Sequence, residues 1–203
     1  MNAGILRRAV ALVLYLAALL GSAACTRDPV APLEEPLAGI CARLDNAIAR
    51  FDPRFVSPDD QWEAVARVVP GGFGGMTLTS PGGNTIYLVD PTRFAEARRV
   101  AARAEACPNR ARLWALGPVA AAVAVLPGRW DYIQLRTWYD LLLGNLTRGF
   151  TLADIDEDKN RLTFGFRDEA SQAQFRDVVV RLGVPLDAVA IVIFRIVPLR
   201  AGV

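Results

Sequence analysis

The sequence predicts an α+β fold of two tandem small lobes, each built as helix, β-hairpin, helix and strand, preceded by one amphipathic helix. Two β-prone hairpins, at 76–89 and 150–166, interrupt segments of helical periodicity. Each hairpin leads to an aspartate that can cap a helix, Asp90 and Asp168. When Asp90 is aligned with Asp168, the two hairpins align to within one residue. This indicates a duplicated unit of roughly 77 residues.

The first segment, residues 1–24, has the features of a signal peptide. Two arginines precede an apolar run over 9–21, which is shorter than the roughly 20 residues that a membrane-spanning helix needs. Small residues then lead into Cys25, and two interpretations stay open: cleavage by an ordinary signal peptidase, or lipidation of Cys25 as in bacterial lipoproteins. The proline-rich segment 25–36 is typical of a semi-rigid tether and favours lipidation.

Removal of residues 1–24 leaves a formally neutral chain. That segment carries two arginines and no acidic residue, so the 23 basic residues fall to 21, the number of acidic ones. No basic run remains, and the composition argues against binding to nucleic acid and against electrostatic docking on a membrane. We expect a chain in the bacterial cell envelope, attached only through its N-terminal lipid and facing the periplasm or the exterior. Without that lipid we expect it to be periplasmic or secreted.

A leading helix is predicted over 37–52, where apolar residues recur at spacings of three and four. The first lobe is predicted over 59–127. It begins with a short helix, opened by two aspartates and ended by Pro70, and continues through a glycine-rich corner into the first hairpin. Asp90 followed by proline then predicts a helix that stops near Pro108.

The last part of the first lobe is an apolar run over 119–127. This run fits a buried strand or the end of a helix, and its length and flanking prolines favour the strand. Residues 109–118 show no clear pattern.

The second lobe is predicted over 130–198 and repeats this order. Asp131 caps a helix, the second hairpin follows, and Asp168 caps a helix that ends at Gly183. The closing segment 188–197 is apolar on both faces, which predicts a central strand.

The three cysteines of the chain are Cys25, Cys41 and Cys107. If Cys25 carries lipid, the other two form an even pair in an oxidising compartment. Cys41 and Cys107 both fall on inward helix faces, so the sequence predicts a disulfide that joins the leading helix to the first lobe. Two buried reduced thiols are the alternative.

Acidic residues at every second position, Asp154, Asp156 and Asp158, resemble the start of a calcium-binding helix–loop–helix. Such a loop needs glycine at position six and a bidentate glutamate at position twelve. Lys159 and Gly165 occupy those positions, and the flanking segments are strands. The pattern therefore predicts a solvated hairpin turn and no metal site.

Other candidate chemistry has a simpler structural explanation. The chain contains no histidine, which excludes a Ser-His-Asp or Cys-His triad. The glycine-rich segments precede strands or occupy hairpin tips, where they serve turns and close packing rather than phosphate binding. The turn acids together with Glu169 lack a cleft suited to glycoside hydrolysis. Trp130, Trp138 and Tyr139 fit a carbohydrate or peptide groove, but their helical spacing favours core packing. We therefore expect no cofactor and no enzymatic activity.

Three stretches carry a resemblance to a known family. They are "PGGFGGMTLTSPGGNTIYLVDP" at 70–91, "DIDEDKNRLTFGF" at 154–166 and "LGVPLDAVAI" at 182–191. Together they span about residues 70–196 and resemble the non-catalytic N-terminal region of secreted bacterial trypsin-like proteases, which is similar in plan to the pro-region of α-lytic protease. The resemblance implies a module that assists folding of a protease and blocks its active site through a C-terminal tail. In contrast to that family, we expect no protease domain after this region.

The sequence thus favours a non-enzymatic envelope lipoprotein that binds another envelope or secreted protein, with a protease as the partner that the resemblance implies. Addition of a strand to a sheet edge, or docking of the C-terminal strand, would need no special side chains. A structural envelope lipoprotein without a discrete ligand is the alternative, and a hydrolase ranks third.

Overall fold

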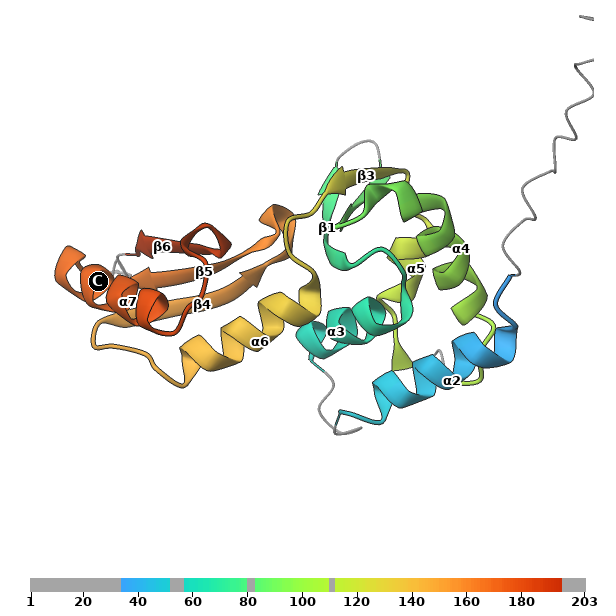
Figure 1. The fold of residues 1–203 in the computed structure, drawn as a ribbon, viewed down its shortest axis with the longest axis horizontal. Coiled ribbons are helices and arrows are strands. Elements are labelled where there is room, and N and C mark those ends of the chain that lie inside the picture. Colours follow the sequence, from blue (N-terminus) through green and yellow to red (C-terminus); the bar gives the residue numbers. More distant parts are fainter. Residues whose placement is uncertain (1–33, 52–56, 80–82, 110–111, 195–203) are drawn as a thin grey trace, which may run out of the picture. The chain divides into compact units, whose positions relative to one another are not determined.

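The computed structural model describes residues 34–51, 57–79, 83–109 and 112–194. It confirms the predicted fold class, because the described chain forms two separate three-stranded sheets with helices packed against them (Figure 1). We call α3 to β3 the first lobe and α6 to β6 the second lobe. Residues 36–203 belong to one compact unit, so contacts between the two lobes lie within that unit.

A leading helix, α2 (Leu37–Ile48), precedes the first lobe. The first lobe contains, in chain order, α3 (Pro58–Val68), β1 (Phe73–Thr79), β2 (Gly83–Leu88), η1 (Pro91–Arg93), α4 (Phe94–Ala104), α5 (Leu116–Ala120) and β3 (Ala124–Pro127). Strand β2 is central in this sheet, since it pairs antiparallel with β1 and parallel with β3.

The second lobe repeats this topology. Its elements are α6 (Tyr132–Leu143), β4 (Phe150–Asp156), η3 (Glu157–Lys159), β5 (Arg161–Phe166), α7 (Glu169–Arg181), η4 (Leu186–Ala188) and β6 (Val189–Ile193). Strand β5 is central, antiparallel to β4 and parallel to β6.

The duplication extends to the register of the hairpins. Phe73 pairs with Leu88 just before a bulge in β1, and Phe150 pairs with Phe166 just before a bulge in β4. A bulge at the same point of both hairpins supports a duplicated unit, because bulges are specific features of a backbone rather than random defects.

The aspartates that mark the repeat, Asp90 and Asp168, both cap the start of a helical segment. The Asp90 carboxylate accepts a hydrogen bond from the Thr92 amide, and the Asp168 carboxylate accepts one from the Ser171 amide. Asp90 begins the short 3₁₀-helix η1 rather than α4 itself, which starts at Phe94. Capping in both lobes satisfies backbone donors that a helix start would otherwise leave unpaired.

Two boundaries differ from the sequence-based prediction. The leading helix ends at Ile48, before the predicted end at residue 52, and residues 52–56 lie outside the described part. Helix α3 begins at Pro58 after Ser57, whose hydroxyl and Asp60 form a reciprocal capping box. The predicted helix opening at Asp59 and Asp60 therefore starts one residue earlier.

For the apolar run 119–127 the sequence favoured a buried strand over the end of a helix, and this preference is wrong for the first residues of the run. Its first residues complete α5, and only Ala124–Pro127 form β3, whose side chains are mostly exposed. Both alternatives that the composition left open thus occur within the same run, because alanine and valine suit either structure when no polar periodicity separates them.

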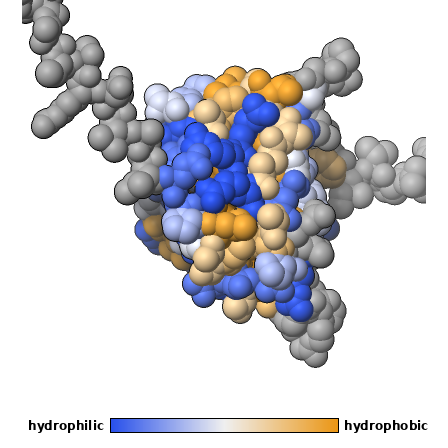
Figure 2. Space-filling view, turned by 90° about the vertical axis from the view of Figure 1, so that its right-hand side faces the viewer, coloured by the Kyte–Doolittle hydropathy of each residue, from blue (hydrophilic) through white to orange (hydrophobic). Residues whose placement is uncertain are grey.

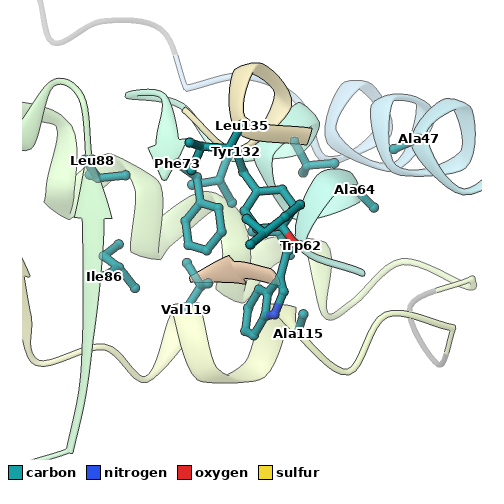
Figure 3. Close-up of a cluster of buried hydrophobic side chains, with 14 of the residues drawn as sticks. Ala47, Trp62, Ala64, Phe73, Ile86, Leu88, Ala115, Val119, Tyr132 and Leu135 are labelled. Carbon is teal, nitrogen blue, oxygen red and sulfur yellow. The ribbon is translucent and has the colours of Figure 1, made fainter. Parts of the chain in front are cut away.

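The core of the first lobe includes side chains from the second. Tyr132 and Leu135 of α6 are fully buried and lie beside Phe73 and Trp62 (Figure 3). The rings of Trp62 and Phe73 are stacked with centroids 5.8 Å apart. In the second lobe, Phe175 packs against the aromatic residues of β5, with ring centroids 4.8 Å apart. Helix α6 therefore belongs to one continuous core.

The predicted disulfide is present in the structure and joins α2 to the turn that follows α4. Cys41 and Cys107 have Cα atoms 5.4 Å apart, which suits an unstrained bridge. Cys107 is buried, and Cys41 lies on the side of α2 that packs on the core. The leading helix is thus held by a covalent bond as well as by packing.

On the end of the first lobe formed by α2 and α4, the surface is hydrophilic at its centre with hydrophobic patches beside it (Figure 2). Within the residues that the structure describes, no helix is both long and apolar enough to cross a membrane.

Candidate functional site

The outer edge of the second sheet is the first candidate for binding. Strand β6 pairs with β5 alone, so it lies at a sheet edge. The prediction that the closing strand is central is therefore wrong. Its side chains are apolar on both faces, but this composition does not fix the position of a strand in its sheet.

The edge of β6 presents main-chain groups for pairing. The Phe194 amide donates to the Phe166 carbonyl at 2.8 Å, so the amide of residue 194 points inward. Successive residues of a strand alternate in direction, and the main-chain groups of Ile191 and Ile193 therefore point away from β5. No other described strand pairs with these outward groups, but the Ile191 carbonyl accepts a hydrogen bond from the Gln172 side chain of α7 at 2.6 Å. Among the described residues, only Ile193 at this edge has both its amide and its carbonyl without a partner.

The equivalent edge of the first sheet is blocked. Leu88 pairs with Pro127 in β3, just as Phe166 pairs with Ile193 in β6. The Gly128 amide donates to the Leu88 carbonyl at 2.8 Å, which matches the bond of Phe194 in the second lobe. Pro127 occupies the position in β3 that is equivalent to Ile193 in β6. Because proline has no N–H, the first sheet has no outward hydrogen-bond donor at this position.

The side chains around the β6 edge are apolar and accessible. Val192, Ile193 and Phe194 are 37%, 39% and 48% exposed, and Leu186 of the preceding turn is 44% exposed. Grouped apolar residues of this kind next to the outward main-chain groups of Ile193 are typical of an edge that accepts another strand.

The second candidate is a charged cleft of about 610 Å³ between α3 and α6. Nine residues line it: Arg50, Phe51, Asp60, Glu63, Arg67, Ile133, Arg136, Thr137 and Asp140. Most of the charged groups pair with one another. Arg67 contacts Glu63 at 2.6 Å, and Arg136 lies 3.7 Å from Asp60 and 3.4 Å from Asp140. The cleft therefore offers little unpaired charge to a ligand.

The acidic hairpin forms a turn, as predicted, but the turn is not fully solvated. Lys159 contacts the Asp156 carboxylate at 2.8 Å, so a cation from the protein itself occupies the turn. Within the described ranges, no group of three or more Asp, Glu, Cys or His side chains is placed to hold a metal ion. The tip of the turn, η3, packs against β1 of the first lobe.

Asn160 joins the two lobes and was not identified as important from the sequence. Its carboxamide oxygen accepts the amides of Arg129 and Trp130 at 2.7 and 3.0 Å. Its nitrogen donates to the carbonyls of Gly74 and Trp130 at 2.8 and 2.7 Å. The residue is buried and left-handed, with φ of 50°, a conformation that asparagine adopts more readily than most residues.

The first lobe is shaped to receive this asparagine. A Cβ on Gly74 would lie 2.4 Å from the Asn160 amide nitrogen, and a Cβ on Gly75 would lie 2.8 Å from the Glu157 carbonyl oxygen. The glycine-rich corner therefore serves close packing, as the sequence predicted, and its partner is the tip of the second hairpin. Tyr87 adds a further bond by donating its hydroxyl to the Asp158 carbonyl at 2.9 Å.

A buried phenol lies near the same contact. Tyr132 donates to the Asp59 carboxylate at 3.0 Å, and Arg136 contacts the other oxygen of that carboxylate at 3.1 Å. Burial, followed by the charge of Asp59, raises the pKa of the Tyr132 phenol, so it stays protonated and acts as a donor.

The aromatic residues considered as a groove pack against the core instead. Trp130 and Trp138 meet edge to face with centroids 5.0 Å apart, and Tyr139 lies 6.0 Å from Phe164. Trp130 is also covered by the guanidinium of Arg129 at 5.1 Å. These contacts leave no row of exposed rings for a sugar or a peptide among the three residues.

Cys25, the predicted lipidation site, lies outside the described residues. Comparisons of the chain with protein-family models, with curated proteins and with solved structures give no match.

Proposed function

We propose that this chain is a non-enzymatic, lipid-anchored module of the bacterial cell envelope that binds another envelope or secreted protein by strand addition at β6. The observation that carries the proposal is the difference between the two duplicated edges. The edge of β3 is blocked by Pro127, whereas β6 has Ile193 at the equivalent position and keeps its outward N–H.

The chemistry of the edge indicates an extended, apolar segment as the partner's binding element. Main-chain hydrogen bonds to Ile193 would supply affinity, and the Ile191 carbonyl would join them only if the Gln172 side chain released it. Val192 and Phe194 would contact side chains of the added strand, since both are more than a third exposed. A partner of this kind needs no charged recognition group, in agreement with the neutral composition of the mature chain.

The family resemblance supports a secreted serine protease as the partner class, with the chain acting as a folding or inhibitory partner. The missing histidine supports a role without triad catalysis. A structural envelope lipoprotein with no discrete ligand remains the alternative that the binding experiment tests.

The test uses the mature chain, tagged at its C-terminus, to capture proteins from the envelope and secreted fractions of the source cells. Ile193→Pro copies the first lobe at the equivalent position and removes only an outward N–H from the β6 ladder. Ile193→Val is the matched control, because it keeps the N–H and the apolar character. Urea unfolding of both variants checks that the sheet is intact.

We expect one protein to be captured by the wild-type chain and by Ile193→Val, with capture by Ile193→Pro reduced about tenfold. Loss of one main-chain hydrogen bond, worth up to about 1.5 kcal/mol, gives this factor. Equal capture by the proline variant would refute strand addition at β6. Specific capture of a protein that is not a protease would refute the partner class alone, and capture of nothing would favour the structural alternative.

The anchoring part of the proposal has a separate test. Intact mass of the chain purified from membranes should correspond to cleavage before Cys25 plus a diacylglyceryl group. An unmodified N-terminus at Cys25, or one further along the chain, would leave a periplasmic or secreted protein.

A further inference from the structure

We propose that the contact between the lobes is a pH-responsive latch, firm when the Glu157 side chain is protonated and weakened when it is ionised. The proposal concerns η3 of the second lobe and the strand β1 on which it packs. It is independent of the binding edge at β6.

The backbone around Glu157 lies directly on the first lobe. The absence of a side chain at Gly75, whose φ is 130°, lets the Glu157 carbonyl approach β1 closely. The bonds of Asn160 and Tyr87 hold the same turn from both sides. The Glu157 side chain is half-buried, and its Cβ would lie 3.1 Å from a Cβ on Gly75, so the side chain begins at the surface where the lobes meet.

Negative groups surround this carboxyl. Asp59 comes from the start of α3, Asp154 from β4 and Asp158 from η3 itself. The buried phenol of Tyr132, from α6, is also close enough to sense the charge of Glu157.

The cations near the contact are engaged elsewhere. The Arg136 guanidinium binds Asp59, Asp60 and Asp140 at 3.1, 3.7 and 3.4 Å. Lys159 binds Asp156 at 2.8 Å. Among the described residues, no cation lies within ion-pair distance of Glu157, so its ionised form has no direct counter-charge.

Burial, followed by the charges of Asp154, Asp59 and Asp158, raises the pKa of Glu157 to about 7. A hydrogen bond from its own backbone amide opposes this shift. The pKa of Asp154 is raised in the same direction by burial and by Asp156 and Asp59. Glu157 therefore keeps its proton to a higher pH than an ordinary carboxyl when the lobes are in contact, and the pKa of Asp154 is shifted in the same direction.

The sign of the pH effect follows from the raised pKa. The closed contact binds the proton of Glu157 more tightly than an open contact does, because an open contact returns the carboxyl toward its ordinary pKa of 4.5. The stabilisation is complete below that pKa and is lost as the pH rises through about 7. The latch is thus firm at pH 5.5 and weak at pH 8.

The amides of Arg129 and Trp130 report directly on the latch, because both donate to Asn160. Their hydrogen-exchange protection factors, corrected for the intrinsic effect of pH, are measured in the mature chain at pH 5.5 and pH 8. The Phe194 amide, which donates to Phe166 in the second sheet, serves as the internal reference.

Glu157→Gln fixes the side chain in a neutral form of nearly the same shape. Glu169→Gln makes the same exchange at an exposed residue of α7 and is the matched control. Asp154→Asn removes one negative neighbour and should move the midpoint of the transition to lower pH.

We expect protection of the reporter amides in the wild-type chain to fall about tenfold between pH 5.5 and pH 8. Each pKa unit corresponds to a factor of ten, and partial exposure reduces the full effect. Glu169→Gln should show the same fall, and Glu157→Gln should stay protected at both pH values. Unchanged wild-type protection, or an unchanged fall in Glu157→Gln, would overturn the proposal. Should Glu157→Gln not fold, a midpoint in Asp154→Asn identical to that of the wild type would overturn it instead.

Discussion

Replacement of Asn160 by alanine is the most direct test of how the lobes are joined. The change removes four hydrogen bonds of 2.7 to 3.0 Å from a residue that is 6% exposed. It also leaves two backbone amides and two backbone carbonyls without a hydrogen-bond partner in a buried region. Each hydrogen bond contributes about 0.5–1.5 kcal/mol, and alanine in the left-handed region costs about 1–2 kcal/mol more than asparagine or glycine.

The sum of these effects gives an expected loss of about 4 kcal/mol in the free energy of unfolding, allowing for water that enters the space and restores some bonds. Asn160→Gly removes the same bonds but keeps the left-handed backbone free of strain, so it should be about 1 kcal/mol more stable than the alanine variant.

Urea unfolding followed by circular dichroism measures both values at pH 6. Asn145→Ala is the control, because that exposed amide donates a single hydrogen bond to the Leu141 carbonyl at 2.8 Å. Its replacement should lower the free energy of unfolding by less than about 1 kcal/mol. A loss below about 1 kcal/mol for Asn160→Ala would show that the four bonds are replaced by solvent without cost. The reasoning on the lobe contact would then be wrong.

The remaining predictions concern the glycine corner, the disulfide and the buried phenol. Gly74→Ala should lower the free energy of unfolding by about 3 kcal/mol, because the new Cβ would lie 2.4 Å from the Asn160 nitrogen. Gly144→Ala is the control: a Cβ there would have no atom nearer than 3.6 Å, so the same urea assay should show a neutral or slightly stabilising effect. Reduction of Cys41–Cys107, which are 66 residues apart, should lower the free energy of unfolding by about 4 kcal/mol, and a chain with both cysteines changed to alanine should not respond to reductant. Tyr132→Phe should cost about 1–2 kcal/mol through loss of the bond to Asp59, and thermal unfolding with no change in midpoint would contradict that role.

The local structure of this protein could be predicted from its sequence, because each signal lies within a few residues. Asp168 caps a helix that begins with the next residue, and the hairpin of β4 and β5 shows alternating apolar residues along β5. The duplication could be found for the same reason, since two local patterns recur at a fixed distance. The disulfide needed only two inward helix positions and an oxidising compartment.

The contact between the lobes could not be predicted, because it depends on residues that are far apart in the chain. Asn160 binds Gly74, which lies 86 residues earlier. Two weak signals existed: an asparagine after an acidic turn, and adjacent glycines in a corner that a simple turn would not require. The edge position of β6 was also hidden, because apolar side chains on both faces are compatible with burial and with a binding edge alike.

The buried position of Tyr132 and Leu135 has a consequence for the order in which the chain acquires its structure. Synthesis delivers the N-terminal part first, yet the first lobe lacks two of its buried side chains until α6 has emerged (Figure 3). A nascent chain that stops at residue 127 should therefore remain loosely packed even though its own sheet is complete. The first lobe can complete its core only after α6 of the second lobe has been synthesised. The two duplicated units therefore depend on each other during folding as well as in the folded structure.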